Sequence, residues 1–154
     1  MERLRWVQPI ARPPFRLSTP RHPLKLKGIA YEKKVNFSLV ERFGVANYIP
    51  SQWFKYQKFG DKIRFCQTDG LLFQPKQFKL LIIEIKYKHT PDAYWQIENK
   101  YLPVCRWLFP DWEISTVEVV KWYDPSTEFP TPITMRRELL ECAPGEFGVH
   151  IYTP

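Results

Sequence analysis

Hydrophobic and polar positions along the chain predict the order helix, three strands, helix, strand. The first helix is expected from Gly28 to Phe43, because Asn36, Leu39, Val40 and Phe43 fall on one helical face and Gly44 suits the position just past a helix end. Glu32 shares the face that packs on the sheet, and an acid turned inward there needs a functional reason. Apolar and β-branched runs predict the strands, which are Gln52–Gln57, Phe65–Phe73, Lys79–Lys88 and Glu113–Trp122. Helices that alternate with strands in this way indicate an α/β domain.

The second helix has clear start and stop signals. Thr90 suits the N-cap and Pro91 the first helical position, and apolar residues at helical spacing continue to Leu108. Pro103 is expected to kink this helix and Pro110 to end it, because proline lacks the N–H that a helix interior needs.

The C-terminal extension, residues 123–154, is rich in proline and carries weaker signals. A short helix, Thr134–Cys142, and a short strand, Gly148–Tyr152, are expected in it, packed on the core. Arg136 and Arg137 would add to the basic surface of the protein.

Length and composition fit one compact domain. The chain has 154 residues, of which 44% are hydrophobic and 16% aromatic, enough for a hydrophobic core. No stretch approaches the roughly 20 apolar residues of a membrane span, and the N-terminus alternates arginine and proline where a signal peptide needs an apolar segment. We therefore expect a soluble, cytoplasmic protein with no membrane partner.

Cysteine and histidine residues give no sign of a disulfide framework, a zinc ribbon or a Cys/His nucleophile pair. The three cysteines are widely spaced, without a Cys-x-x-Cys pair, and the three histidines are equally isolated, which favours surface or core positions for them. These residues are Cys66, Cys105, Cys142, His22, His89 and His150.

The positive charge is concentrated at the N-terminus. Residues 1–27, the N-terminal arm, hold seven basic residues and one acidic residue, a net charge of +6 out of +7 for the whole chain. The five prolines of the arm exclude a helix there and predict an extended segment. An extended basic segment gains affinity for phosphates by counterion release. The arm is therefore either a nucleic-acid contact, through Arg12, Arg16 and Arg21, or a solvated basic tail.

Aromatic residues allow two interpretations. They include candidates for a platform on which nucleic-acid bases stack, although most aromatic residues in a domain of this size belong to the core. The candidates are Trp53, Tyr56, Trp95, Trp107, Trp112 and Trp122.

The two central strands bring acidic residues together. A proline-containing turn over residues 74–78 closes them into a hairpin, in which Phe73 faces Leu80. The same register places Asp69 opposite Glu84, and directly opposed residues have Cβ atoms about 4.5–5.5 Å apart. Two carboxylates at that separation repel each other unless a cation lies between them.

Lys86 lies two residues beyond Glu84 and so on the same face of the strand. Mg²⁺ binds through one or two carboxylates plus substrate phosphate, and a lysine beside such a pair is suited to hold a water for in-line attack on phosphorus. The alternative is an ordinary amphipathic hairpin that shows Asp69, Glu84 and Lys86 to solvent as a charge cluster.

Residues 28–122 resemble the PD-(D/E)XK nuclease superfamily, and within it the RecB-like and lambda-exonuclease-like branch, which phages often encode. The resemblance implies a restriction-endonuclease-like αβββαβ core, with a mixed central sheet flanked by helices. That family has an aspartate on its second strand and a Glu-x-Lys motif on its third, where Asp69, Glu84 and Lys86 stand here. Thr68 takes the place of the proline that gives the motif its name.

Two helix motifs of that branch bear on the site. Its Gly-x-x-x-(Glu or His) motif on the first helix matches Gly28 to Glu32. Its Gln-x-x-x-Tyr motif on the second helix matches in part, because Gln96 is followed by Lys100 at i+4 and by Tyr101 at i+5. At about 100° per residue, i+4 lies nearly in line and i+5 lies off the face. We therefore expect Gln96 and Lys100 to face substrate and Tyr101 to pack in the core.

The resemblance implies hydrolysis of DNA phosphodiester bonds that depends on Mg²⁺ or Mn²⁺ and leaves a 5′-phosphate. The expected catalytic residues are Asp69, Glu84, Lys86, Glu32 and Gln96. The expected metal ligands are Asp69, Glu84, Glu32 and Ile85. The expected contacts with duplex or single-stranded DNA are Lys33, Lys88, Lys100, Arg12, Arg16 and Arg21. Two alternatives stay open, a non-catalytic nucleic-acid-binding module on a nuclease fold and a nuclease directed at RNA or junctions, and the sequence predicts no oligomer.

Overall fold

The computed structural model describes residues 3–154, and its centre is a mixed sheet of seven strands. The strands are β1 Leu4–Ile10, β2 Tyr48–Lys58, β3 Ile63–Gln74, β4 Lys79–Lys88, β5 Glu113–Trp122, β6 Ile133–Met135 and β7 Phe147–Ile151. The helices are α1 Pro23–Phe43, α2 Pro91–Gln96 and α3 Leu102–Leu108, with a π turn, η2 Ile97–Tyr101, between the last two and 3-10 turns at η1 Pro75–Gln77 and η3 Leu139–Glu141.

The strands stand in the order β1-β2-β3-β4-β5-β7-β6. Strands β1 to β4 pair with one another in antiparallel fashion. Strand β5 runs parallel to β4 and to β7, and β6 runs parallel to β7. The predicted α/β class is therefore confirmed. The order helix, three strands, helix, strand is also found, and it extends from α1 to β5.

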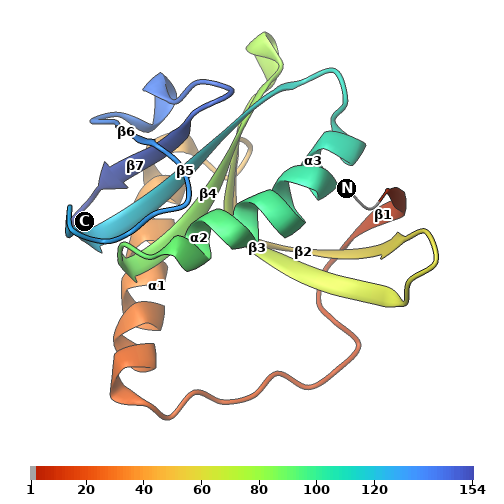
Figure 1. The fold of residues 1–154 in the computed structure, drawn as a ribbon, viewed down its shortest axis with the longest axis horizontal. Helices are drawn as coiled ribbons and strands as arrows, with labels where there is room; N and C mark the ends of the chain where they lie inside the picture. Colours follow the sequence, from red (N-terminus) through yellow and green to blue (C-terminus); the bar gives the residue numbers. More distant parts are fainter. Residues whose placement is uncertain (1–2) are drawn as a thin grey trace.

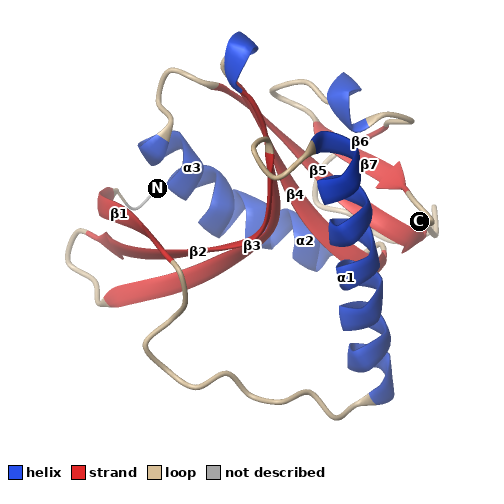
Figure 2. Cartoon of the chain, turned by 180° about the vertical axis from the view of Figure 1, so that it is seen from behind, coloured by secondary structure: helices blue, strands red, loops and turns tan. Residues whose placement is uncertain are grey.

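Helices cover both faces of the central strands (Figures 1 and 2). On one face, Val35 of α1 packs in a cluster with Ile83. On the other, Ile97 and Val104 of the segment from α2 to α3 pack in a cluster with Ile82. A strand that is covered on both faces reads as a continuous apolar run, which explains residues 80–83. No helix in residues 3–154 has the length and apolarity needed to cross a membrane.

The expectation that the N-terminal arm contains no helix is wrong. Within its described part, β1 pairs with β2 at the edge of the sheet, and α1 begins at Pro23 and not at Gly28. The ring of His22 caps α1 by accepting a hydrogen bond from the N–H of Leu24 at 3.2 Å. Proline is tolerated at both places, because an edge strand and the first turn of a helix each leave an N–H without a partner.

The prediction of a helix over Thr134–Cys142 is also wrong. This stretch holds the end of β6 and the short turn η3. The N–H of Arg136 donates to the carbonyl of Val149 in β7 at 2.8 Å, and its guanidinium pairs with Glu146 at 2.8 Å. Pairing with a distant strand thus overrides the local helix propensity. The predicted strand Gly148–Tyr152 is found as β7.

Candidate active site

The hairpin of β3 and β4 has the register predicted from the sequence. Phe73 lies opposite Leu80, and the paired positions end just before Asp69 and Glu84. At that point Asp69 Oδ2 accepts a hydrogen bond from the N–H of Ile85 at 2.7 Å. A carboxylate thus satisfies a backbone donor of the neighbouring strand where the two strands part, which places the acidic residues at an opening of the sheet.

The carboxyl groups of Asp69 and Glu84 are close enough to hydrogen-bond to each other. Because two ionised carboxylates both accept, this contact needs a proton on one of them or a cation between them. Burial raises the pKa of both groups, and the negative charge of Glu84 raises the pKa of Asp69 further. Glu84 is buried, and among the described residues its Oε1 has no hydrogen-bond partner.

Glu32 comes to this pair from α1. Its carboxyl group lies within hydrogen-bonding reach of Asp69. Burial, followed by the charge of Asp69, raises the pKa of Glu32 to about 7. The structure therefore brings together three acidic residues from one helix and two strands, all with raised pKa values.

Lys86 is the cation of this cluster. Its Nζ lies 3.4 Å from Glu84 Oε2, and its side chain keeps 25% of its surface exposed. Its charge lowers the pKa of Asp69, of Glu84 and of Glu32, against the effect of burial. A half-buried ammonium group beside a carboxylate pair is thus present where the sequence predicts it.

A fourth acid, Glu118, stands beside the cluster and was not predicted. Its position on β5 pairs with that of Glu84 on β4, so the two lie on neighbouring strands. Glu118 is fully buried, contacts His89 Nδ1 and accepts a hydrogen bond from the N–H of Thr90 at 3.1 Å. Burial raises the pKa of Glu118 to about 8. The His89 ring stacks on Phe129 of the C-terminal extension, and His89 is buried, one of the two kinds of position that the sequence favoured for it.

The helix expected to run straight through Gln96 and Lys100 is interrupted by the π turn η2. The N–H of Leu102 bonds to the carbonyl of Ile97, five residues back. Pro103, which follows, lacks an N–H, and its ring clashes with the carbonyl four residues before it, a common cause of such a distortion. The prediction that Gln96 and Lys100 share one face assumed α-helical spacing and is therefore wrong.

The π turn instead brings Tyr101 near the acidic residues. A π turn holds one more residue than an α turn, so i+5 takes the place that i+4 has in an α-helix. Tyr101 is buried in the core, and burial together with the charges of Glu84 and Asp69 raises its pKa far above the usual value. Gln96 Oε1 is buried and has no hydrogen-bond partner among the described residues. Tyr101 thus packs in the core, as expected, and the charges of the acidic residues act on its hydroxyl.

Gly70, directly after Asp69, allows a close approach that was not predicted. Tyr48 crosses it and donates a hydrogen bond from its hydroxyl to Asn36 Oδ1 at 2.5 Å. Burial and then the charges of Asp69 and Glu32 raise the pKa of Tyr48. A glycine inside a strand pattern often marks such an approach. Gly70 was therefore the sequence signal from which this contact could have been predicted.

Gly70→Ala is expected to lower the free energy of unfolding by about 1–3 kcal/mol, the usual cost of overpacking. The added Cβ would lie 2.0 Å from the hydroxyl oxygen of Tyr48 and 2.8 Å from its ring carbon. Chemical denaturation measures the change. Gly28→Ala is the matched control, because a Cβ there meets nothing within 4 Å and alanine favours the helix. Equal stability losses in the two variants would show that the approach of Tyr48 does not constrain Gly70.

The acidic pair fits a hard cation, although it does not form a complete metal site. Mg²⁺ is held by one or two carboxylates, with water and phosphate in the other positions, and the orphaned Glu84 Oε1 is an acceptor that a cation would satisfy. Across residues 3–154, no three His, Cys, Asp or Glu side chains gather closely enough to hold a metal by themselves. Ile85, the other predicted ligand, uses its N–H for Asp69 and buries its side chain under α1.

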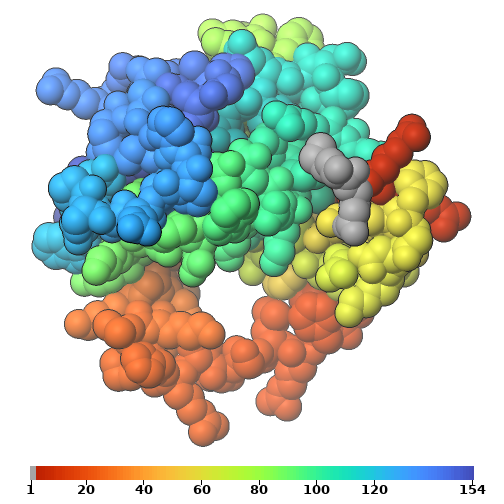
Figure 3. Space-filling view, in the orientation of Figure 1, coloured from red at the N-terminus to blue at the C-terminus, as the bar shows by residue number. Residues whose placement is uncertain are grey.

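The predicted nucleic-acid contacts are all exposed, but they lie on different parts of the surface. In the segment between β1 and α1, the ring of Phe15 packs edge-on against the rings of Trp53 and Phe65. Figure 3 shows the molecule hollowed where this segment and α1 face the rest of the chain. The exposed predicted contacts are Lys33, Lys88, Lys100, Arg12, Arg16 and Arg21.

Comparison of the chain with known proteins identifies no relative. No family model, no curated protein and no solved structure matches the chain.

Proposed function

We propose that the protein is a metal-dependent DNA nuclease of the PD-(D/E)XK type, with a restriction-endonuclease-like core. The observation that carries the proposal is the convergence of Asp69, Glu84, Glu32 and Lys86, from three separate elements, at an opening of the sheet. The order of elements from α1 to β5 supports it, because it is the αβββαβ order of that superfamily.

In this proposal Asp69 and Glu84 hold Mg²⁺ or Mn²⁺, with Glu32 as a further metal or water ligand. The metal would supply a lowered pKa for a bound water and charge stabilisation on the phosphate. Lys86 donates a hydrogen bond to the attacking water and stabilises the charge that develops as this water attacks phosphorus. The bond between phosphorus and the 3′ oxygen breaks, so that one product ends in a 3′-hydroxyl and the other in a 5′-phosphate.

Glu118 has a supporting position in this arrangement. It is held by His89 and by the N–H of Thr90, and its pKa is lowered by the charge of Lys86, which shows that the two groups interact. Glu118 would therefore add to the negative charge that attracts the ammonium group of Lys86.

A second candidate function is a nucleic-acid-binding module that keeps the nuclease fold without cleaving. The absence of a ready group of three metal-ligating side chains in residues 3–154 favours it. The two functions differ in one property, since only the nuclease needs a divalent cation to act on DNA.

The deciding experiment is cleavage of circular and linear DNA with Mg²⁺ or Mn²⁺, with EDTA as the control. We expect metal-dependent cleavage that EDTA abolishes. Cutting of the circle indicates an endonuclease, and cutting of only the linear form indicates an exonuclease. Single strands, RNA and four-way junctions, added as competitors, identify the preferred substrate. Binding of DNA without cleavage of any of these substrates would leave the binding module as the better explanation.

A further inference from the structure

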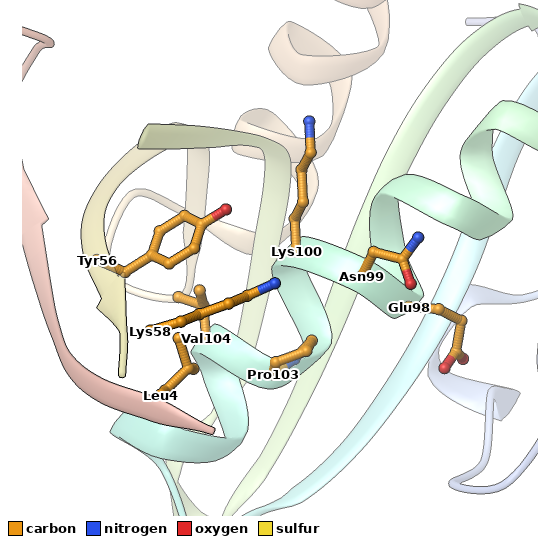
Figure 4. A pocket seen from close by; sticks show the side chains of 8 residues that line it. All are labelled: Leu4, Tyr56, Lys58, Glu98, Asn99, Lys100, Pro103 and Val104. Carbon is orange, nitrogen blue, oxygen red and sulfur yellow. The ribbon is translucent and has the colours of Figure 1, made fainter. Parts of the chain in front are cut away.

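A basic groove runs along the seam between β1, the end of β2 and the segment from η2 to α3. It consists of two cavities, of about 360 and 650 Å³, that share Leu4 and Pro103 in their walls. The smaller cavity lies between β2 and η2, with Tyr56 and Lys58 on the β2 side and Lys100 rising from η2 (Figure 4). The larger cavity continues from it along α3.

Positive charge dominates the groove. Arg3, Arg5 and Arg106 line the larger cavity, in addition to the two lysines of the smaller one. Within residues 3–154, none of these three arginines forms an ion pair with a carboxylate. Glu98 is the one acid among the described residues of the wall, and its carboxylate points away from the two lysines in Figure 4. These three arginines are thus placed to take an external anion.

Two exposed aromatic rings accompany these cations. Phe59 is 60% exposed and Trp107 is 46% exposed, and both line the larger cavity. The guanidinium carbon of Arg3 lies 5.9 Å from the centre of the Phe59 ring. Flat apolar faces beside cations suit a ligand that carries both aromatic bases and phosphates.

Lys100 connects the groove to the acidic residues. It directly precedes Tyr101, whose ring lies among the charges of Glu84 and Asp69. The charge of Lys100 also lowers the pKa of the Cys66 thiol, against the effect of burial. Cys66 in turn contributes to the raised pKa of Tyr101. The smaller cavity is therefore lined by the residue that directly precedes Tyr101, whose pKa is raised by the charges of the acidic residues.

We propose that this groove binds a single strand of nucleic acid, with phosphates on Arg5, Arg106 and Lys100 and bases stacked on Phe59 and Trp107. A duplex cannot use the two rings in this way, because its bases already stack on one another inside the helix. The inference rests on the proposed function, since it identifies an unpaired strand as the form of substrate that the acidic residues receive.

The test is the binding of short fluorescent oligonucleotides in EDTA, followed by fluorescence anisotropy at several salt concentrations. Arg5→Ala/Arg106→Ala is expected to weaken binding of oligothymidylate by about tenfold or more. The slope of log affinity against log salt should fall by about 1.4, or 0.7 for each lost phosphate contact on a single strand. Lys76→Ala/Arg137→Ala is the matched control, with the same loss of charge at exposed positions outside the groove.

Trp107→Ala tests the stacking. It should weaken binding by about five-fold or more without a change in the salt slope, and Phe78→Ala, which removes an exposed aromatic ring that does not line the groove, should leave binding unchanged. A deoxy and a ribo oligonucleotide of equal length distinguish the two sources of single strand. A duplex of the same length should compete poorly.

The inference fails if the groove variants bind as the wild type does, if the control variants lose as much affinity, or if the duplex competes as well as the single strand. These outcomes are separate from those of the cleavage experiment, because no metal is present. Loss of binding in the groove variants of a protein that never cleaves would support the groove and reject the nuclease. Metal-dependent cleavage by the wild type, together with unchanged binding in the groove variants, would support the nuclease and reject the groove.

Discussion

Lys86→Ala is expected to slow metal-dependent DNA cleavage by about 100- to 1,000-fold while DNA affinity changes by less than about twofold. This is the usual effect of removing one hydrogen-bond donor that stabilises charge in the transition state. The ammonium group lies 3.4 Å from Glu84 Oε2, and in the proposed mechanism it acts on the attacking water and not on bound DNA. A rate that falls without a change in affinity is the signature of an interaction made only in the transition state.

The measurement is single-turnover cleavage together with DNA binding in EDTA. Lys79→Ala is the matched control, since it removes a lysine from the same strand, whose Nζ lies 3.6 Å from Glu113 at the surface. Exposed ion pairs of this kind contribute little to stability, so this variant should cleave at nearly the wild-type rate. Full activity in Lys86→Ala would remove the lysine from the mechanism, and a parallel loss of affinity would assign it to DNA binding.

The central hairpin could be predicted because its information is local. Pro75 sets the turn, and the period of two along each strand then fixes that Phe73 faces Leu80. From that register the approach of Asp69 to Glu84 follows without knowledge of the rest of the fold. The strand Glu113–Trp122 was predicted with its observed bounds from another local signal, the β-branched residues Val117, Val119 and Val120.

The other parts of the site depend on contacts between distant residues. Glu118 meets His89 only because β5 returns parallel to β4 after the whole helical segment. The approach of Tyr48 to Gly70 depends on the pairing of β2 with β3. No periodicity in the sequence encodes such contacts.

The error over the shared face of Gln96 and Lys100 has a backbone cause. An angle of about 100° per residue holds for an α-helix, whereas η2 inserts one residue into that repeat. The sequence signal was Pro103, which we expected to kink the helix but not to change its period. With the π turn in place, the five-residue spacing from Gln96 to Tyr101 is compatible with the Gln-x-x-x-Tyr motif of the proposed type of nuclease.

Asp69→Asn is expected to abolish the rise in melting temperature that Mg²⁺ produces in the wild type. A ligand at 100 times its Kd stabilises the folded state by about 2.7 kcal/mol, which is a rise of several degrees for a chain of this size. Asparagine keeps an oxygen that can accept from the N–H of Ile85, so the fold should survive. It loses the negative charge that attracts the metal. Asp111→Asn makes the same change at an exposed position and should keep the rise.

The same variant is expected to be more stable than the wild type in EDTA at pH 8, because it removes one of three mutually repelling acids. A carboxyl whose pKa is raised on folding contributes stability that is complete below its unfolded pKa and is lost as pH rises through the folded pKa. For Glu32 this window runs from its ordinary 4.5 to about 7. The metal-free wild type should therefore lose melting temperature across that range, and Asp69→Asn should lose less.

The two effects together distinguish a metal site from an ordinary buried acid. An acid with a purely structural role would make Asp69→Asn less stable with or without Mg²⁺, since its hydrogen bond would weaken and nothing would be gained. A metal ligand makes the variant more stable in EDTA and less stable than the wild type at saturating Mg²⁺, so the order of the two melting temperatures reverses. A wild type that does not respond to Mg²⁺ at all would instead show that the acids no longer engage a metal, which is the property of the binding module.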